Sequence, residues 1–365
     1  SRLLAWLSTG RRHWLPVAVA MAWFSLTMGL VNGRMVECFK IGTWDVGVYE
    51  QQIWHILHDG RPWSSLLGFH GFGDHFTPIL YPLALLYALW PGSLWLLWLQ
   101  TAALALAVIP LYLLARRELS SPALAWGVAL AYLAYLPLRK LAIFPFHPEA
   151  LAPLFLFCAF YGWRTGRRAW ALAFLVLLAG TRETLLLSIA SFGLYLFLHE
   201  RKRLAGALLF VGSLAALALL LSAVIPWFRG AGAPNVYFSE RYPGFGHDAG
   251  ELLTTVVTHP GKVLDLVLTT KKLKYLRDLL APWAFLPVLA PATLLLALPG
   301  LFIHLLSPNP AQTSVSFQYT TDVFPWMVLA AIFGLARLCR GWKTWAKQES
   351  LPRLRRHPPG ADHVV

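Results

Sequence analysis

The side chains best suited to chemistry in this chain lie in short clusters at the ends of its apolar segments. Five clusters contain Asp45, Asp74, His75, His147, Glu149, Arg182, Glu183, Gln318, Tyr319 and Asp322. Carboxylates and histidines can act as general bases or bind divalent cations, and a guanidinium can bind phosphate through two hydrogen bonds. On the topology derived below, all five clusters lie on one side of a membrane. This partition is typical of an active site at one membrane face rather than of a pore or a scaffold.

The composition indicates a polytopic, all-α integral membrane protein. Of the 365 residues, 57% are hydrophobic and 13% are charged, whereas soluble proteins average about 45–50% and about 25%. The 17 Trp and 12 Tyr residues fit belts at the two membrane interfaces. The net charge of +14 comes from short basic clusters beside apolar runs. We therefore assign the charge to topology and anionic headgroups, with no nucleic-acid partner.

About ten segments are apolar enough to cross a membrane, which takes roughly 20 residues. They are 14–31, 93–115, 122–138, 149–163, 169–181, 184–198, 204–226, 273–289, 291–306 and 323–339. Residues 76–90 form a further apolar stretch that contains Pro78 and Pro82. If 76–90 also crossed, the internal basic clusters would face outward, against the positive-inside rule. We therefore predict that 76–90 is re-entrant or interfacial and that both termini are cytoplasmic.

The chain is predicted to form a single transmembrane domain, residues 1–349. It has long outer loops at 32–75 and 227–272, and the second could form a lid or an amphipathic cover over a site. A disordered cytoplasmic tail is expected at 350–365. The first helix is expected to be retained rather than cleaved. The three cysteines lack CxxC spacing, which argues against a disulfide framework or a zinc site.

Each candidate residue also has a structural interpretation. Asp45 is a candidate general base or metal ligand, or the N-cap of a short helix at 46–57. His75 is a candidate base, or a satisfied polar histidine next to a helix cap. His147 and Glu149 flank a proline, and their spacing could offer two ligands to one divalent ion. That spacing is not an established metal motif.

The remaining candidates would bind substrate. Arg182 and Glu183 interrupt an apolar run, so they bind phosphate or form a structural ion pair. Lys271 and Lys272 belong to a basic cluster that either grips a diphosphate or forms the solvated face of an amphipathic helix. The strip with Gln318 and Tyr319 could bind sugar hydroxyls or be an ordinary loop. The candidate substrate-binding residues are thus Arg182, Glu183, Lys271, Lys272, Gln318 and Tyr319.

Motifs of several enzyme classes are absent from the sequence. No P-loop, GxGxxG, HExxH or GxSxG pattern occurs. Their absence argues against an ATPase, a nucleotide-dependent oxidoreductase, a zincin and a serine hydrolase. A nucleotide-sugar donor is also disfavoured, because the candidate site is not on the cytoplasmic side.

Several segments together resemble the DUF2079 family of predicted bacterial membrane proteins. The resemblance covers roughly residues 40–340 and is carried by residues 44–54, 73–81, 111–117, 146–150 and 182–183. The motifs around Asp45 and around His147 and Glu149 are specific, whereas the apolar stretches are not. The chain departs from the family pattern at Glu50 and Thr184, and Gln318-Tyr319 stands where the family often has His-Tyr.

The resemblance implies a GT-C-like fold in the bacterial inner membrane. GT-C enzymes transfer sugars from polyprenyl-phosphate donors at the extracytoplasmic face, and an acidic residue of their first outer loop is typically essential. By position that residue is Asp45. We therefore expect a GT-C-like glycosyltransferase with Asp45, His75, His147 and Glu149 as catalytic residues. Mg²⁺ or Mn²⁺ at Asp45 and Glu149 is an expected cofactor.

Two other functions are alternatives to an enzyme, and the sequence favours the first over the second. A degenerate GT-C-like scaffold could be a non-catalytic integral subunit of a larger membrane complex, in contact with partner subunits and lipid. A transporter would need charged groups near the midplane and often inverted repeats. The sequence shows neither clearly, so a lipid-linked sugar remains the expected substrate.

Overall fold

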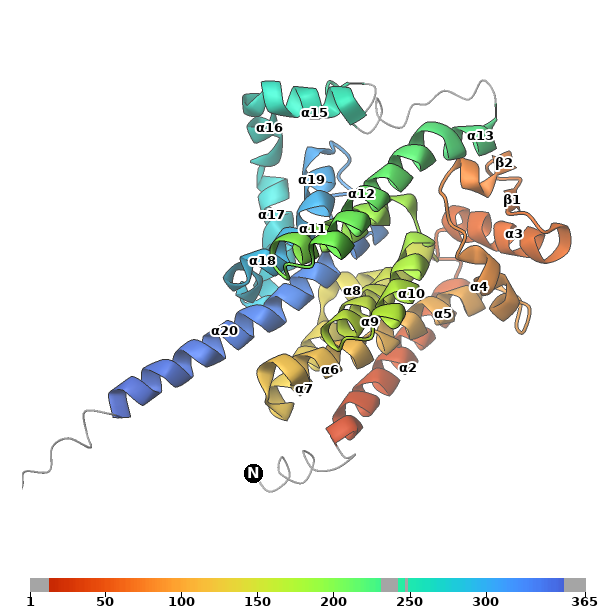
Figure 1. Cartoon of the computed structure of the whole chain (residues 1–365). Coiled ribbons are helices and arrows are strands. Elements are labelled where there is room, and N and C mark those ends of the chain that lie inside the picture. The colour runs from red at the N-terminus through yellow and green to blue at the C-terminus, as the bar shows by residue number, and fades with distance from the viewer. Residues whose placement is uncertain (1–12, 231–241, 247–248, 351–365) are drawn as a thin grey trace, which may run out of the picture.

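The computed structural model describes residues 13–230, 242–246 and 249–350, with side chains up to residue 342. The fold is predominantly helical (Figure 1), as the composition predicted. The predicted tail at 350–365 lies outside the described residues, apart from Ser350 at the end of the last helix.

Four helical segments are long and apolar enough to cross a membrane. They are α2 (Leu15–Glu37), α5 with α6 (Ser93–Leu106 and Val108–Leu119), α12 with its continuation (Arg203–Arg229) and α20 (Phe324–Ser350, apolar to Trp342). Four shorter apolar helices are Pro122–Ala134, Arg168–Ala179, Glu183–Leu198 and Pro291–Leu306. These segments agree in position with seven of the ten predicted spans and part of an eighth, which is interrupted as described below.

The predicted span 273–289 differs from the structure. Helix α17 (Thr270–Leu280) ends inside it and is followed by two 3₁₀ turns, η6 (Ala281–Trp283) and η7 (Leu286–Leu289). Ala284 and Phe285 between the turns have left-handed backbones, with φ of 49° and 56°. Prolines in both turns lack the N–H that a continuous helix requires. The next span is likewise built from α18 (Pro291–Leu294), η8 (Leu295–Ala297) and α19 (Leu298–Leu306).

The first outer loop folds into short elements. Helix α3 (Thr43–Asp59) leads to a hairpin of β1 (Trp63–Ser64) and β2 (Phe69–His70), to η2 (Gly71–Gly73) and to α4 (Leu80–Tyr87). Eight residues of α-helix span only about 12 Å, less than half of a hydrocarbon core of about 30 Å. The length of α4 therefore fits a stretch that does not cross the membrane.

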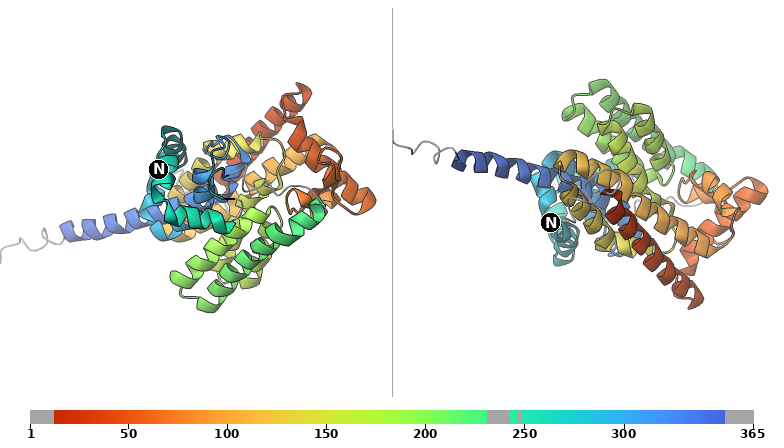
Figure 2. Two further views of the ribbon diagram at one scale, coloured as in Figure 1. Left: turned by 90° about the horizontal axis from the view of Figure 1, so that it is seen from above. Right: turned by 90° about the horizontal axis from the view of Figure 1, so that it is seen from below.

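Helices α7 (Pro122–Ala134), α8 (Leu136–Ala142), η3 (Pro148–Leu151), α9 (Ala152–Arg164) and α10 (Arg168–Ala179) form the middle of the chain. They are followed by η4 (Glu183–Leu185), α11 (Leu186–Leu198), α12 (Arg203–Leu219), the π segment η5 (Leu220–Val224) and α13 (Ile225–Arg229). The second outer loop contains α15 (Ala249–Thr258) and α16 (Pro260–Val267), and η9 (Gln318–Asp322) precedes α20. Figure 2 shows that the end of α20 projects beyond the other helices.

Burial separates central from peripheral helices. In α20 and in α5 with α6, 61% of the most apolar window is buried, compared with 11% in the Arg203–Arg229 helix. Glycines bring that peripheral helix close to α11, since a Cβ on Gly206 would lie 2.6 Å from the backbone nitrogen of Phe197. Close approach through small residues is a common way to pack membrane helices. The exposed leucines of the outer helix are then available to lipid.

Helix α9 separates two polar regions of the fold. Glu149 lies in the turn before α9, and Arg164 ends the helix about 20 Å away. Arg164 forms ion pairs with Glu118 at 2.8 Å and Glu200 at 3.0 Å. These interactions join the ends of three helices on the side where the sequence placed its basic clusters.

Candidate functional site

Residues from several separate segments of the chain meet at a polar cavity of about 130 Å³, to which the β1–β2 hairpin contributes Leu67. Its lining comes from α3, from the end of the first outer loop, from the turn before α9, from the turn between α10 and α11, and from η9. The lining residues are Trp44, Asp45, Val48, Tyr49, Leu67, Asp74, His75, His147, Arg182, Gln318 and Tyr319. The structure thus brings together predicted residues from all five sequence clusters.

Helix α3 presents Asp45 to the cavity. Gly42 is the N-cap residue, and Asp45 lies in the first turn, so the interpretation of Asp45 as an N-cap is wrong. A carboxylate in this turn still interacts favourably with the helix dipole. Tyr49 follows four residues later and lines the same cavity, because residues four apart share a helix face. The side chain of Asp45 is 42% exposed and therefore accessible from the cavity.

His147 is held in one tautomer by its own turn. Its Nδ1 lies 2.8 Å from the carbonyl oxygen of Pro145. A carbonyl can only accept, so Nδ1 carries the proton and a neutral His147 keeps an unprotonated Nε2. That nitrogen lies 3.8 Å from Asp45 Oδ1. The pair can thus accept or relay a proton at the cavity.

A buried ion-pair chain forms the back of the cavity. Arg182 Nη1 donates to Glu149 Oε1 at 2.5 Å, and Arg182 Nη2 lies 3.1 Å from His75 Nε2. His75 Nδ1 lies 2.9 Å from Glu183 Oε1, whose other oxygen accepts the N–H of Phe76 at 3.1 Å. Since a guanidinium only donates, His75 Nε2 is the acceptor and Nδ1 carries the proton. Arg182 and Glu183 thus pair with Glu149 and His75, and not with each other as the structural alternative of the sequence analysis had it.

The electrostatics of the cavity are dominated by carboxylates. Four of them, Asp45, Asp74, Glu149 and Glu183, face or back the cavity, while Arg182 is the only guanidinium among the described residues of its lining. Burial raises the pKa of Tyr49 well above its usual value, and Glu149 adds to the shift. The phenol is therefore neutral at physiological pH and can donate a hydrogen bond. The surplus negative charge favours a cation or a donor-rich ligand.

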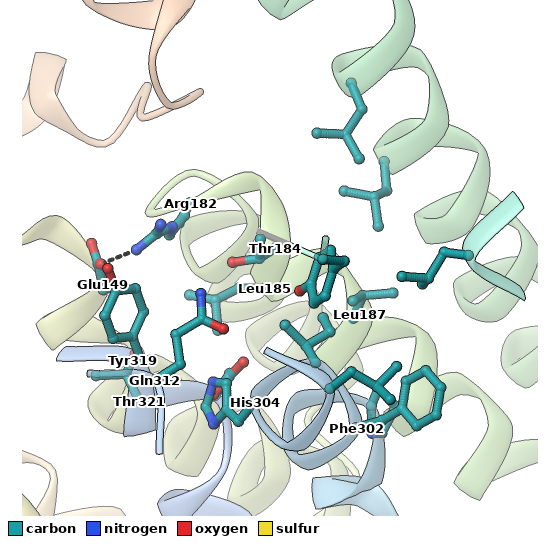
Figure 3. Close-up of a pocket in the computed structure, with 18 of the residues that line it drawn as sticks. Glu149, Arg182, Thr184, Leu185, Leu187, Phe302, His304, Gln312, Tyr319 and Thr321 are labelled. Atoms are coloured by element: carbon teal, nitrogen blue, oxygen red, sulfur yellow. Dashed lines mark hydrogen bonds and ion pairs between the residues drawn. The ribbon is translucent and has the colours of Figure 1, made fainter. Parts of the chain in front are cut away.

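A second, apolar cavity of about 280 Å³ adjoins the first. Arg182 and Tyr319 line both, and the Arg182 guanidinium lies 5.9 Å from the centre of the Tyr319 ring. Figure 3 shows Arg182, Glu149 and Tyr319 on one side of this cavity and Leu187 and Phe302 on another. Its apolar wall comes mainly from leucines of α11, α12, η5 and α15 and from α19. The two cavities together suit an amphiphile.

The predicted basic residues of α17 are placed elsewhere. Lys271 and Lys272 do not line either cavity, and Lys272 Nζ donates to the carbonyl oxygen of Leu305 at 2.5 Å. Burial lowers the pKa of Lys272. Within these cavities, a role for the two lysines in holding phosphate has no geometric support.

Three polar residues of the cavity walls were not predicted from the sequence. Tyr49 shares a helix face with Asp45, and the i, i+4 spacing could have identified it. His304 is a lone polar residue in an apolar helix, and Gln312 lies in a turn without a recognisable motif. His304 Nδ1 lies 2.9 Å from the hydroxyl of Tyr275, and its Nε2 lies 3.4 Å from Asp322 Oδ1.

The residues present fit a weakly held divalent cation better than a permanent one. In the described part of the chain, no three His, Cys, Asp or Glu side chains cluster as a metal site. Asp45 and His147 face the same cavity, whereas one oxygen of Glu149 is occupied by Arg182. Mg²⁺ is often held by one or two carboxylates together with substrate phosphate. Asp45 is the candidate protein ligand for such an arrangement.

Comparison with known families agrees with the membrane character of the fold. The model of a family described as "Predicted membrane protein (DUF2079)" matches residues 36–354. No curated protein matches the chain significantly. The family description names no activity, so function has to be argued from the site.

Proposed function

Because the chain belongs to the DUF2079 family of predicted membrane proteins, we propose that it works on a lipid substrate at one membrane face. The reaction we propose is sugar transfer from a polyprenyl-phosphate donor to an acceptor hydroxyl on the extracytoplasmic side. The observation that carries this proposal is the junction of a polar and an apolar cavity at Arg182 and Tyr319. A lipid-linked sugar has the same division into polar and apolar parts.

The proposed pose follows from the two linings. The apolar tail lies against α11, α12 and α15, the phosphate lies near Arg182, and the sugar occupies the polar cavity with Gln318 and Tyr319. Arg182 already binds Glu149 and His75. The positive charge of its guanidinium is therefore only partly available to a phosphate. The four carboxylates around this guanidinium support a divalent cation, Mg²⁺ or Mn²⁺, that arrives with the phosphate. The cation would supply charge stabilisation to the leaving phosphate.

The acid–base chemistry is assigned to Asp45 and His147. The acceptor hydroxyl oxygen forms a bond to the anomeric carbon while the bond from that carbon to the phosphate oxygen breaks. The hydroxyl proton passes to Asp45, with His147 Nε2 3.8 Å away as a second acceptor. The electron pair of the broken bond leaves with the lipid phosphate. His75 and Glu183 position Arg182 from behind.

The wider proposal includes a GT-C-like fold with about ten crossings in a bacterial inner membrane and both termini in the cytoplasm. The four long apolar helices and the four shorter ones support many crossings. The match of the polar clusters to one cavity supports their placement on one side.

The test is transfer from polyprenyl-phosphate sugars by protein purified in mild detergent with Mg²⁺ or Mn²⁺. We expect Asp45→Asn to abolish transfer. Asp59→Asn is the matched control, because Asp59 ends the same helix and is not one of the residues that line the cavity. Loss of transfer in both variants, or in neither, would contradict the assignment of Asp45.

A non-catalytic subunit is the second candidate function. The departures at Glu50 and Thr184 motivate it, and it predicts that Asp45→Asn changes nothing. Mass-spectrometric identification of a stoichiometric partner in the same preparation, without transfer, would favour this candidate.

A further inference from the structure

The polar end of the apolar cavity contains buried oxygen atoms without a hydrogen-bond donor. Among the described residues, no donor reaches Glu149 Oε2 or Gln312 Oε1, although these residues are only 1% and 2% exposed. Asp322 Oδ1 also lacks a donor, because His304 Nε2 lies 3.4 Å away but outside hydrogen-bond geometry. All three residues line the cavity. Buried acceptors without donors are rare in folded proteins, so three at one cavity point to a donating ligand.

The charge at this end argues against an anionic group that arrives without a cation. Glu149 and Asp322 contribute two carboxylates, and Arg182 contributes one guanidinium that already binds Glu149. An anion alone would lie among oxygens that repel it, whereas the donor phosphate proposed above arrives with a divalent cation. A neutral or cationic group with N–H or O–H bonds would instead satisfy them.

The rest of the cavity accepts a hydrocarbon chain. Leu217 of α12 and Leu221 of η5 line it together with Phe302 and Ile303 of α19, and Leu253 of α15 adds to the wall. Gly300 lets Asp322 approach α19, since a Cβ there would lie 2.9 Å from the Asp322 carboxylate. The oxygen atoms that lack a hydrogen-bond donor thus lie beside the apolar part of the cavity.

We propose that the apolar cavity binds an amphiphile whose head group donates hydrogen bonds to Glu149, Gln312 and Asp322. The head is a polyol or an amine, and its chain lies against α12, α15 and α19. This inference rests on the proposed function only in treating the bound amphiphile as a substrate. It adds that the head group, and not phosphate alone, is recognised in this cavity.

The test uses full-length protein in nanodiscs of phosphatidylcholine, whose headgroup has no hydrogen-bond donor. Native mass spectrometry then measures the binding of four probes with dodecyl chains. They are a glucoside, a primary amine, a trimethylammonium salt and a phosphate. The amine and the trimethylammonium share a positive charge but differ in N–H donors, so they separate hydrogen bonding from charge.

We expect one molecule of glucoside or amine to bind, and the trimethylammonium salt and the phosphate to bind at least fivefold more weakly. Glucoside binding alone would identify a polyol head, and amine binding alone an ammonium head. Trimethylammonium that binds as tightly as the better of the glucoside and the amine, or a phosphate that binds more tightly than both, would overturn the proposal.

Variants at Gln312 sharpen the result. Gln312→Leu removes an acceptor and should weaken glucoside binding on the order of fivefold, the effect of one typical hydrogen bond. Gln312→Glu keeps an acceptor and adds a charge, so it should retain the glucoside and bind the amine more tightly. If Gln312→Leu does not fold, the response of Gln312→Glu alone decides, and unchanged amine binding would refute the proposal.

The binding test does not depend on catalysis. Donor-head binding without sugar transfer would leave this inference intact and remove the proposed activity. Sugar transfer without selective donor-head binding would do the reverse.

Discussion

Arg182 Nη1 lies 2.5 Å from Glu149 Oε1, and both side chains are buried where the polar and apolar cavities meet. The two residues are 33 positions apart, with Glu149 just before α9 and Arg182 just after α10. Their interaction joins the two ends of this helix pair and fixes the guanidinium at the junction of the cavities. The pair is therefore both a structural element and part of the candidate site.

Replacing one residue of this pair should reduce stability more than replacing both. Arg182→Leu leaves Glu149 buried without its partner, which should destabilise the protein by about 3–5 kcal/mol. The double variant Arg182→Leu/Glu149→Leu removes both charges and should recover much of that loss. Thermal unfolding in detergent measures both variants, and a double variant as unstable as the single one would show that the pair is not coupled in this way.

Asp322 gives a prediction about pH. Burial raises the pKa of its carboxyl, against the opposing effects of His304 and Arg182. The folded state thus binds the proton more tightly than the unfolded state, and this contribution to stability is lost as pH rises from the unfolded pKa through the folded one. Asp322→Asn cannot ionise, so it should raise the unfolding temperature at pH 8 and have a smaller effect near pH 4.

Asp59→Asn is the control for the pH series. The Asp59 side chain is 44% exposed on α3, so burial cannot penalise its charge in the same way. A gain for Asp322→Asn that is equal at both pH values would show that burial of the charge is not its cause.

Gln100 is predicted to position His147. It is fully buried in α5, donates to the carbonyl oxygens of Leu141 and Phe144, and accepts the N–H of His147 at 3.1 Å. Gln100→Leu leaves these groups unsatisfied and should cost on the order of 1–3 kcal/mol of stability. If transfer is established, Gln100→Leu should also lower kcat more than it changes KM.

Gln100→Glu separates positioning from general stability. It keeps the acceptor for His147 N–H but loses the two donated hydrogen bonds. We expect kcat to recover partly while stability remains low. Equal kcat in the Leu and Glu variants would mean that the hydrogen bond to His147 does not position the histidine.

The sequence singled out residues that line the polar cavity, but it did not predict which side chains pair with one another there. Asp45, His75, His147 and Arg182 stand out because ionisable groups at the ends of apolar segments are costly and need a reason. Their meeting in one cavity is consistent with the predicted topology, in which all five clusters lie on one side. The partners of Arg182 were not predictable, because its neighbour Glu183 suggests a local pair, whereas packing brings Glu149 to it instead.

The fold shows the same limit. Apolar length identified α2, α5 with α6, α12 and α20, whose hydrophobic runs are continuous. The region 273–306 is apolar throughout and predicted two spans, but 273–289 is not a continuous helix and 291–306 is built from three short helical pieces. Its prolines and the left-handed pair Ala284 and Phe285 break it into short turns, and the backbone conformation at such a pair is not evident from hydropathy.

The contact between α11 and α12 provides the last prediction. A Cβ on Gly206 would lie 2.6 Å from Phe197 N and 2.7 Å from Gly193 O, whereas a Cβ on Gly212 of the same helix would meet nothing within 4 Å. Gly206→Leu must push the helices apart and should cost about 1–3 kcal/mol. Gly212→Leu gains helix propensity without a clash, so it should be neutral or slightly stabilising. Similar unfolding temperatures for the two variants would show that α12 does not pack on α11 as closely as its glycines allow.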